Sequence, residues 1–491
     1  MRLVFVAGLL VALAQSSDVS NTAEQTCVTL QQTLGPDIVQ FRSTKAFQET
    51  VNGTWNLANA ELLPFCVVFP KNTTVVQSAM KTIFENQVNY AIQSGGHSAM
   101  KGWNNVQDGV LIALSEMKEV SYDPEKDTIT IQPGVRWGEA LSILEPFGVA
   151  PVGGRQSDVG TGLILGGGLS FLSPSHGFAA DSIKELDVVL ADGTLVTATA
   201  TNPQSDLLRA LKGGGNRFGI VTRYELYPVH TGTKDDKQWV GGAIQYPSNS
   251  AEVVLKAMAH YVRDVTDPKA GMAPYMHQTR KPLVNPPFSV TLLTLLADTS
   301  DIIVTAYLFY NGTELPQNIF GEFLSAPRSS ANISRLSYFD IANFLPPGND
   351  TGRGERFGAS AVLGDEDMFV NVYRLWSKYV SRFREEYGFM VLAFTPILTP
   401  QIQVGRDRGG NAIDPPLVSY AAIQVSEPLP LGVAEPSGDA DEAKVQLLAQ
   451  LGRPDDIPLF LNECDLRQNV YESYGDYEFL KRTYAKYDPS R

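Results

Sequence analysis

One of the five histidines of the chain stands in a short glycine-rich loop. Residues 93–102 read QSGGHSAMKG, so that His97 lies between a glycine pair and a serine, directly after the apolar run at 88–92. Histidine is the side chain whose charge changes near physiological pH, and glycines let backbone N–H groups approach a phosphate closely. The loop therefore places a histidine beside a backbone that suits a phosphate. A solvated or capping histidine is the alternative interpretation.

Two further stretches of the chain are rich in glycine. PVGGRQSDVGTGLILGGGLSF begins at Pro151, and KGGGNRFGIVTRYEL begins at Lys212. Neither fits the dinucleotide fingerprint G-x-G-x-x-G, because Leu165 and Phe218 occupy the third glycine positions, and the Walker pattern is absent. Several such loops in one domain indicate a large phosphate-bearing cofactor outside a Rossmann or P-loop fold. Turns in a compact α+β domain remain the alternative.

The pattern around these loops predicts the elements that position them. Apolar spacing predicts a strand at 65–69, a helix at 72–84 and a strand at 88–93, which places the His97 loop at the C-terminal end of a strand. Further on we expect a strand at 128–132, a helix at 137–144 and two strands around the Asp192-Gly193 turn. Residues from about 60 to 230 therefore predict one α+β domain.

The pattern of apolar residues changes after this domain. Between 240 and 425, strand-like runs such as SVTLLTLLA and IIVTAYLFY alternate with helical patterns such as MFVNVYRLWSKYVSRFREEYG. This alternation predicts a second domain in which helices cover one face of a sheet. The stretch at 426–444 is rich in proline, glycine and acidic residues, so we expect a surface connection there before order returns at 458.

Composition excludes several classes of partner. The 491 residues carry a formal net charge of −14, and the basic residues are scattered rather than gathered into a stripe. This charge disfavours nucleic acid and anionic membranes as partners. Histidines and cysteines do not cluster at metal-ligand spacing, so we expect no metal site.

The N-terminus predicts entry into the secretory pathway. Residues 1–16 carry a short apolar run and small residues before Gln15, as in a signal peptide. Five sequons predict N-glycosylation at Asn52, Asn72, Asn311, Asn332 and Asn349. We therefore expect a secreted protein or one in a secretory-pathway vesicle.

The chain has three cysteines, which is enough for one disulfide. A bridge between Cys27 and Cys66 would tie an N-terminal helix to the first core strand and leave Cys464 over. Three buried free thiols are the alternative.

Four of these stretches together resemble one known family. PFCVVFPKNTTVVQSAM, QSGGHSAMKG, GRQSDVGTGLILGGGLSF and LKGGGNRFGIVTRYELYPV are similar to the PCMH-type FAD-binding domain of the vanillyl-alcohol oxidase superfamily. The nearest branch is the fungal berberine bridge enzyme-like oxidoreductases. The C-terminal pattern NECD…YG…L…KYDP of this chain resembles the closing segment of that branch. The resemblance implies an α+β fold in which two subdomains bind FAD, beside a substrate domain with an antiparallel sheet covered by helices.

The resemblance also divides the chain. We expect an FAD-binding domain at 17–230, with its PCMH-type core at about 60–230, and a substrate-binding domain at 231–440. A C-terminal segment at 441–491 is expected to return to the FAD domain.

By the same resemblance, His97 is bonded covalently to the 8α-methyl group of the flavin. Many relatives add a second bond from a cysteine, but Gln156 stands at that position here, so a single link is implied. Other positions that match cofactor contacts of the family are Gly95, Gly96, Ser98, Gly160, Gly166, Gly167, Gly168, Gly214, Gly215, Asn216, Gly219, Val221 and Asn462. Val159 matches a position thought to control access of dioxygen, although it also suits a packing role.

The family deprotonates its substrate with a side chain on the strands above the flavin. Tyr420 matches that region and is the first candidate for the acid/base, with His277 as the second; an ordinary strand aromatic is the alternative for Tyr420.

The resemblance implies an FAD-linked oxidase of a small organic metabolite in fungal secondary metabolism, which passes a hydride to flavin N5 and electrons to O₂, giving H₂O₂. A dehydrogenase, a cyclase that couples oxidation to cycloaddition or replaces it, and an extracellular carbohydrate oxidase are the alternatives.

Overall fold

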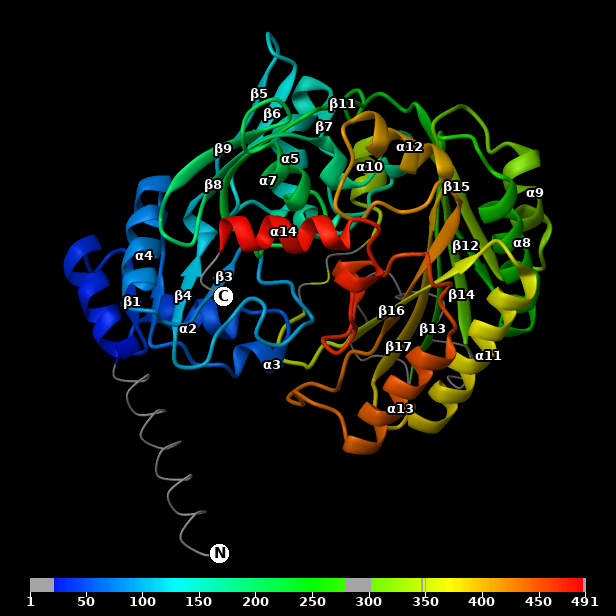
Figure 1. The fold of residues 1–491 in the computed structure, drawn as a ribbon. Helices are drawn as coiled ribbons and strands as arrows, with labels where there is room; N and C mark the ends of the chain where they lie inside the picture. Colours follow the sequence, from blue (N-terminus) through cyan, green and yellow to red (C-terminus); the bar gives the residue numbers. More distant parts are fainter. Residues whose placement is uncertain (1–21, 280–301, 346–347, 349, 489–491) are drawn as a thin grey trace, which may run out of the picture.

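A computed structural model describes residues 22–279, 302–345, 348 and 350–488 of the chain. The predicted signal peptide at 1–16 and the sequon at Asn349 lie outside these residues. The described strands form three larger sheets and one two-stranded ribbon, and helices cover the outer faces (Figure 1).

The first subdomain is built on a four-stranded sheet in the order β1-β2-β4-β3. β2 and β3 both pair with β4 in parallel, whereas β1 is antiparallel to β2. Its strands are β1 (Val39–Phe41), β2 (Cys66–Val68), β3 (Tyr90–Gln93) and β4 (Val110–Ala113), and its helices are α2 (Lys45–Asn52), α3 (Leu57–Ala60), α4 (Thr73–Glu85) and a helix at 22–34. The apolar face of α4 is buried against this sheet, as its spacing predicted.

A disulfide joins Cys27, on the helix at 22–34, to Cys66 on β2. Cys464 is a buried free thiol. The predicted pairing is therefore confirmed, and the alternative of three free thiols is excluded.

The second subdomain contains a five-stranded antiparallel sheet in the order β5-β6-β10-β8-β9. Its strands are β5 (Val120–Asp123), β6 (Thr128–Ile131), β8 (Ile183–Val189), β9 (Leu195–Thr199) and β10 (Ile220–Leu226), with β7 (Val149–Ala150) and β11 (Val229–His230) as a separate ribbon. Two helices accompany the sheet, α5 (Trp137–Leu144) and α7 (Ser205–Leu211). The hairpin predicted at Asp192-Gly193 joins β8 to β9, and Gly193 adopts the positive φ that such a turn requires.

The remaining strands form a seven-stranded antiparallel sheet in the order β15-β12-β14-β13-β17-β18-β16. They are β12 (Trp239–Tyr246), β13 (Ala270–Thr279), β14 (Ile303–Tyr310), β15 (Ser330–Leu336), β16 (Phe357–Leu363), β17 (Phe389–Ile397) and β18 (Tyr420–Ser426). Helices α8 (Ala251–Asp264), α9 (Gln317–Ser325), α11 (Glu366–Phe383) and α13 (Gly438–Gln450) cover the face that points away from the first two subdomains (Figure 1). The predicted fold class is thereby confirmed.

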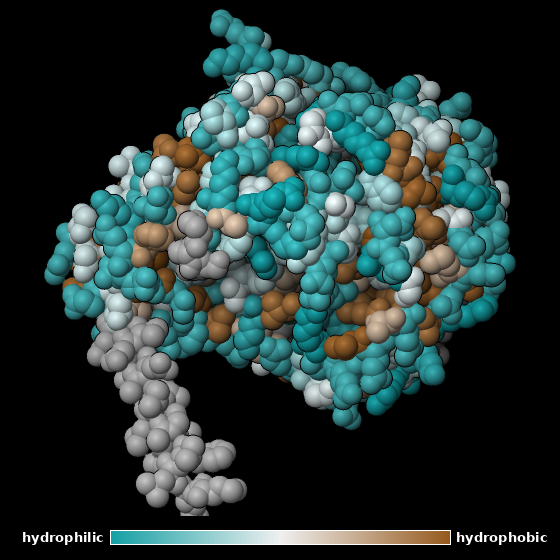
Figure 2. Space-filling view, in the orientation of Figure 1, coloured by the Kyte–Doolittle hydropathy of each residue, from teal (hydrophilic) through white to brown (hydrophobic). Residues whose placement is uncertain are grey.

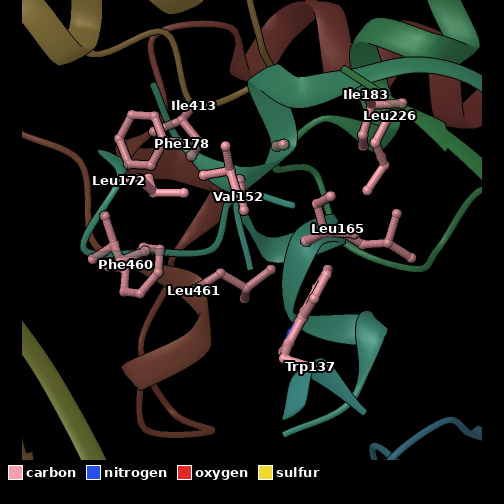
Figure 3. Close-up of a cluster of buried hydrophobic side chains, with 14 of the residues drawn as sticks. Trp137, Val152, Leu165, Leu172, Phe178, Ile183, Leu226, Ile413, Phe460 and Leu461 are labelled. Atoms are coloured by element: carbon pink, nitrogen blue, oxygen red, sulfur yellow. The ribbon is translucent and has the colours of Figure 1, made fainter. Parts of the chain in front are cut away.

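The C-terminal segment packs on the first half of the molecule. Figure 3 shows Phe460 beside Leu172, Phe178 and Ile413 in the buried core. Helix α14 (Tyr477–Tyr487) lies against α7, where Lys486 and Tyr487 both contact the carboxylate of Asp206. The segment that follows the seven-stranded sheet in the sequence therefore completes the hydrophobic core of the first half.

One expected element is correct only in its first part. The composition of 426–444 predicts a surface connection, and 427–437 do connect β18 to α13 without helix or strand, but α13 begins inside the stretch at Gly438. Ser437 caps this helix by accepting a hydrogen bond from Ala440 N, and two acidic residues occupy the first turn. Acidic residues that suggest a loop by composition therefore serve here at a helix N-terminus, where they interact favourably with the helix dipole.

The face of the molecule seen in Figure 2 is mainly hydrophilic, and hydrophobic residues form separate patches on it. No described helix is long and apolar enough to cross a membrane. Among the described residues, no three His, Cys, Asp or Glu side chains are grouped as a metal site would require.

Candidate functional site

A cavity of about 1040 Å³ lies between the glycine-rich loops and the seven-stranded sheet. The predicted cofactor residues that line it are His97, Gly95, Gly96, Ser98, Gln156, Val159, Gly160, Gly166, Gly215, Asn216, Gly219, Val221 and Asn462. Residues far apart in the sequence therefore form one wall, as the glycine-rich stretches suggested.

The two loops that carry His97 and Gln156 touch through their backbones. A Cβ atom at Gly95 would lie 2.6 Å from the backbone nitrogen of Gly160, and one at Gly160 would lie 2.5 Å from the nitrogen of Gly95. Arg136 ties the same loops together, because its guanidinium donates to the carbonyl oxygens of Gly95 and Asp158. Glycine at both positions is thus required by the close approach of two chains.

A third glycine makes room for a side chain from the C-terminal segment. A Cβ at Gly166 would lie 1.7 Å from Oδ1 of Asn462, whose Nδ2 donates to the carbonyl of Leu163 at 2.9 Å. Asn462 is thereby fixed on the cavity wall from the far end of the sequence.

Three of the predicted cofactor glycines do not line the cavity. Gly167 and Gly168 adopt positive φ beneath it, and a Cβ at Gly214 would strike the carbonyl oxygen of Ala210 at 2.2 Å. For these three, packing accounts for the glycine, which is the turn interpretation that the sequence had left open.

His97 is held rigidly at one end of the cavity. Its ring stacks on Trp55 with centroids 4.0 Å apart and an angle of 16° between the planes. Its Nε2 faces Oδ2 of Asp158 at 3.5 Å, and the two side chains are only 10% and 8% exposed. The stacking and the carboxylate together fix the imidazole plane.

Asp158 is held by more than the imidazole. The N–H of Gly348 donates to its Oδ1 at 3.0 Å. Burial alone would raise the pKa of Asp158, but His97 and this backbone donor outweigh it and lower the pKa. The carboxyl group is therefore ionised beside the histidine at neutral pH.

The opposite wall comes from alternate residues of the central strands. On β13, Tyr275 and His277 point into the cavity, whereas Met272 and Met276 face the helices, as the period of two requires. Burial lowers the pKa of His277 to about 4, so its imidazole is neutral at physiological pH. Tyr307, from β14, packs edge-on against Tyr275, with the ring centroids 5.6 Å apart.

Tyr420, the first candidate for the acid/base, does not line the cavity. It shares a face of β18 with Gln424 and Ser426, which do line it, but Tyr420 stands at the other end of the strand and is 2% exposed. Tyr474 of the C-terminal segment lies near it, and burial raises the pKa of Tyr420. The side chain is on the expected face but in the core, so the geometry gives an acid/base role no support.

A buried ion pair lines the cavity near Tyr275. Arg155 donates to Oγ1 of Thr395 at 2.9 Å and lies 3.4 Å from Oε1 of Glu463. Burial raises the pKa of Glu463, and Arg155 opposes that rise. Burial also raises the pKa of Tyr275, while Arg155 lowers it. These groups give the sheet side of the cavity a cluster that can exchange protons.

A second carboxyl group lies at the Trp55 end. Glu355 lines the cavity, is 6% exposed, and has its pKa raised to about 8 by burial, against the lowering effect of Arg353. Its backbone is tied to the His97 loop through Asn56, which accepts from Glu355 N and donates to the carbonyls of Ala99 and Glu355. At neutral pH this carboxyl is mainly protonated.

Five side chains of the cavity region received no role from the sequence alone: Trp55, Glu355, Arg155, Asp158 and Glu463. Trp55 and Glu355 sit in stretches without a motif, so no local signal marks them. Arg155, Asp158 and Glu463 do lie inside the quoted motifs, and a carboxylate two residues after Gln156 could have been noticed.

The cavity fits an extended dinucleotide. Backbone of the glycine loops lines one side, where N–H groups can face a diphosphate. The amide of Asn104 lines the same wall, is 6% exposed, and finds no hydrogen-bond partner among the described residues. A buried amide without a partner is costly, and a polar cofactor would satisfy it. Residues present in the cavity therefore suit FAD, which would bring a redox-active ring to the sheet side.

Comparison with known proteins agrees with this geometry. Residues 64–199 match the family model described as an FAD binding domain. The chain is 32% identical over 400 residues to an uncharacterized FAD-linked oxidoreductase of Arthroderma benhamiae, covering 79% of this chain and 74% of that protein. It is 30% identical to bifunctional solanapyrone synthase of Alternaria solani, covering 88% and 80% of the two chains.

Solved structures share the fold over nearly the whole chain. Carbohydrate oxidase from Microdochium nivale superposes with a TM-score of 0.75 at 20% identity, covering 95% of this chain and 97% of that one. Berberine bridge enzyme from Eschscholzia californica gives a TM-score of 0.71 at 14% identity, with 94% and 96% covered.

Fold and cavity together define an FAD-dependent oxidoreductase with a PCMH-type cofactor domain. Within that class, the chain belongs to the family of fungal FAD-linked oxidoreductases, and its fold is the one that berberine bridge enzyme shows, as its motifs predicted.

Proposed function

We propose that this protein is an FAD-linked oxidase of a small organic metabolite, with His97 as the single covalent anchor of the cofactor. When bound, FAD accepts a hydride from the substrate at N5 and is reoxidised by O₂, giving H₂O₂. The observation that carries the proposal is one cavity with two unlike walls: a glycine-built wall that bears His97, and a sheet wall that bears proton-exchanging side chains.

The cofactor wall supports one anchor rather than two. Gln156 lines the cavity near His97, since a Cβ at Gly348 would lie 3.1 Å from its Nε2 and 3.6 Å from Nε2 of His97. An amide side chain has no nucleophilic sulfur, so it can position a cofactor but cannot bond to it. Val159 lines the same wall, where its size can control the approach of dioxygen to the ring.

On the sheet wall, Tyr275 and His277 are the acid/base candidates. Both point into the cavity from β13. The neutral imidazole of His277 can accept a hydrogen bond from a substrate hydroxyl or amine and orient it. Burial raises the pKa of Tyr275 more than Arg155 lowers it, so its hydroxyl stays protonated at neutral pH and can donate a hydrogen bond or a proton to the reacting group of the substrate.

The substrate that this wall suits is a small aromatic metabolite, as in fungal secondary metabolism. Support comes from the aromatic lining by Tyr275, Tyr307, Phe357 and Phe389, and from a relative that is named as a solanapyrone synthase. Phe309, on the same strand as Tyr307, is buried in the core and adds nothing to this lining.

A turnover assay tests the proposal. Purified full-length protein is screened against small alcohols, phenols and amines, with O₂ consumption and H₂O₂ release measured together. We expect one mole of H₂O₂ per mole of product. Turnover with an artificial acceptor but not with O₂ would make the protein a dehydrogenase. Product formation without flavin reduction under anaerobic conditions would make it a cyclase.

The cellular route of the protein is also part of the proposal. A disulfide is stable in an oxidising compartment, and the described sequon residues Asn52, Asn72, Asn311 and Asn332 are exposed. Asn72 caps α4 through Oδ1, which leaves Nδ2 free for a glycan. We expect endoglycosidase treatment of the full-length protein produced in a fungal host to lower its mass, and unchanged mass would count against secretory passage.

A further inference from the structure

Two buried polar atoms face each other at the His97 end of the cavity. Nε2 of His97 and Oδ2 of Asp158 are 3.5 Å apart, and neither has a closer hydrogen-bond partner among the described residues. An ionised carboxylate beside an imidazole fixes the tautomer that carries its proton on the facing nitrogen. Nε2 of His97 therefore carries the proton, and the lone pair is on Nδ1.

The surroundings hold this arrangement still. Trp55 stacks on one face of the imidazole, so the ring cannot turn out of plane without losing a contact. On the carboxylate, Gly348 N occupies Oδ1, which leaves Oδ2 for the histidine. Arg136 binds the carbonyl oxygens of Asp158 and Gly95, and so couples the loop of the carboxylate to the loop of the histidine.

From this geometry we propose that Asp158 activates His97 for its bond to the cofactor. Asp158 is a positioning residue: it holds Nδ1 as the nucleophile and stabilises the positive charge that develops on the imidazole as Nδ1 forms its new bond. This inference rests on the proposed covalent link at His97 and names the group that makes the link form.

In this step a bond forms between Nδ1 of His97 and the 8α carbon of FAD, and one C–H bond at that carbon breaks. The proton on Nε2 leaves through Asp158 to solvent. Two electrons and two protons pass to O₂, which is the oxidant, and give H₂O₂.

The test separates binding of FAD from bonding to it. Full-length wild type, Asp158→Asn, Asp158→Ala and His97→Ala are produced with limiting riboflavin and then incubated with FAD in air. Tight binding is followed by quenching of flavin fluorescence, and bonding by the flavin that stays with the protein through acid precipitation and by intact mass. Ser157→Ala is the matched control, because it changes the neighbouring residue of the same loop.

We expect Asp158→Asn and Asp158→Ala to bind FAD but to form the bond about a hundredfold more slowly, the scale of a lost acid/base group. Ser157→Ala should match the wild type, and His97→Ala should form no bond. Added formate should accelerate Asp158→Ala, where it can replace the missing carboxylate, and not Asp158→Asn. Rescue of this kind would not follow from a purely structural role.

The outcomes distinguish the two proposals. A wild type that releases all its flavin to acid would overturn the covalent link, and the role of Asp158 with it. Bond formation at the wild-type rate in either Asp158 variant would overturn the role of Asp158 alone. A slow Asp158→Ala that formate does not accelerate would also overturn it, since the carboxylate would then only shape the loop.

Discussion

The two walls of the cavity are built in different ways. The cofactor wall is made of backbone: Gly95 and Gly160 bring two loops into contact, and Gly166 admits Asn462. The sheet wall is made of side chains, with Tyr275 and His277 projecting from β13 and Gln424 from β18. A backbone wall tolerates almost no added atoms, whereas a side-chain wall can change its chemistry without changing the fold. Substitutions in the two walls should therefore fail in different ways.

The largest effect is expected from Gly95→Ala. The added Cβ would lie 2.6 Å from a backbone nitrogen that cannot move alone, so the two loops must separate, at a cost of about 1–3 kcal/mol or more. We expect the purified variant to lack FAD, as measured by its absorbance spectrum, and to melt at a lower temperature.

Gly438→Ala is the control for this change, because nothing lies within 4 Å of a Cβ there. It should retain FAD and wild-type stability. A Gly95→Ala protein with a full complement of FAD would show that the backbone wall is less tightly packed than the contacts indicate.

Removal of the disulfide comes next. Cys27→Ser opens a link across a sequence separation of 39 in the first subdomain, and the free energy of unfolding should fall by about 2–4 kcal/mol. Denaturant unfolding measures the change. Cys464→Ser, which removes the buried free thiol and leaves the bridge intact, should cost less; an equal loss in both would mean that the bridge stabilises the fold no more than the thiol contacts do.

On the sheet wall, Tyr275→Phe should leave the fold and FAD content unchanged and lower kcat by about a hundredfold, as expected for a lost acid/base group. Tyr310→Phe is its matched control. That hydroxyl bonds to Asp267 outside the cavity, so kcat should stay at the wild-type value. Unaltered turnover in Tyr275→Phe would contradict the acid/base role of Tyr275 and indicate that another group of the sheet wall exchanges the proton.

The smallest effect concerns two histidines, one in each half of the molecule. Burial lowers the pKa of His277, and burial with the charge of Arg408 lowers that of His176, each from 6.5 to about 4. Between these values the unfolded chain binds more protons than the folded one, so stability should fall as pH drops from about 6.5 to about 4.

Replacing either histidine by phenylalanine should reduce this acid sensitivity, as read from melting temperatures across that range. Substrate turnover should change in His277→Phe and persist in His176→Phe, because His277 lines the cavity and His176 does not. Equal effects of the two changes on turnover would contradict the assignment of His277 to the substrate wall.

Prediction from sequence was strongest where local pattern decides structure. The strand, helix and strand around 65–93 and the helix at 137–144 were found because their apolar spacing is local. The acidic start of α13 was missed because composition alone does not distinguish a loop from a capped helix N-terminus. Most cofactor positions line the cavity, while Gly167, Gly168 and Gly214 show that a motif mixes contact residues with packing residues.

By itself, the sequence determined the family, the glycine-rich loops and the position of His97, because the cofactor wall consists of short runs of glycine that can be recognised locally. Only the tertiary structure decided which side chains meet across the cavity. Asp158 reaches His97 because two loops touch at glycines, and Tyr420 leaves the site because it is buried in the core at the end of β18 away from Gln424 and Ser426. Such contacts join residues distant in sequence, so no local pattern encodes them.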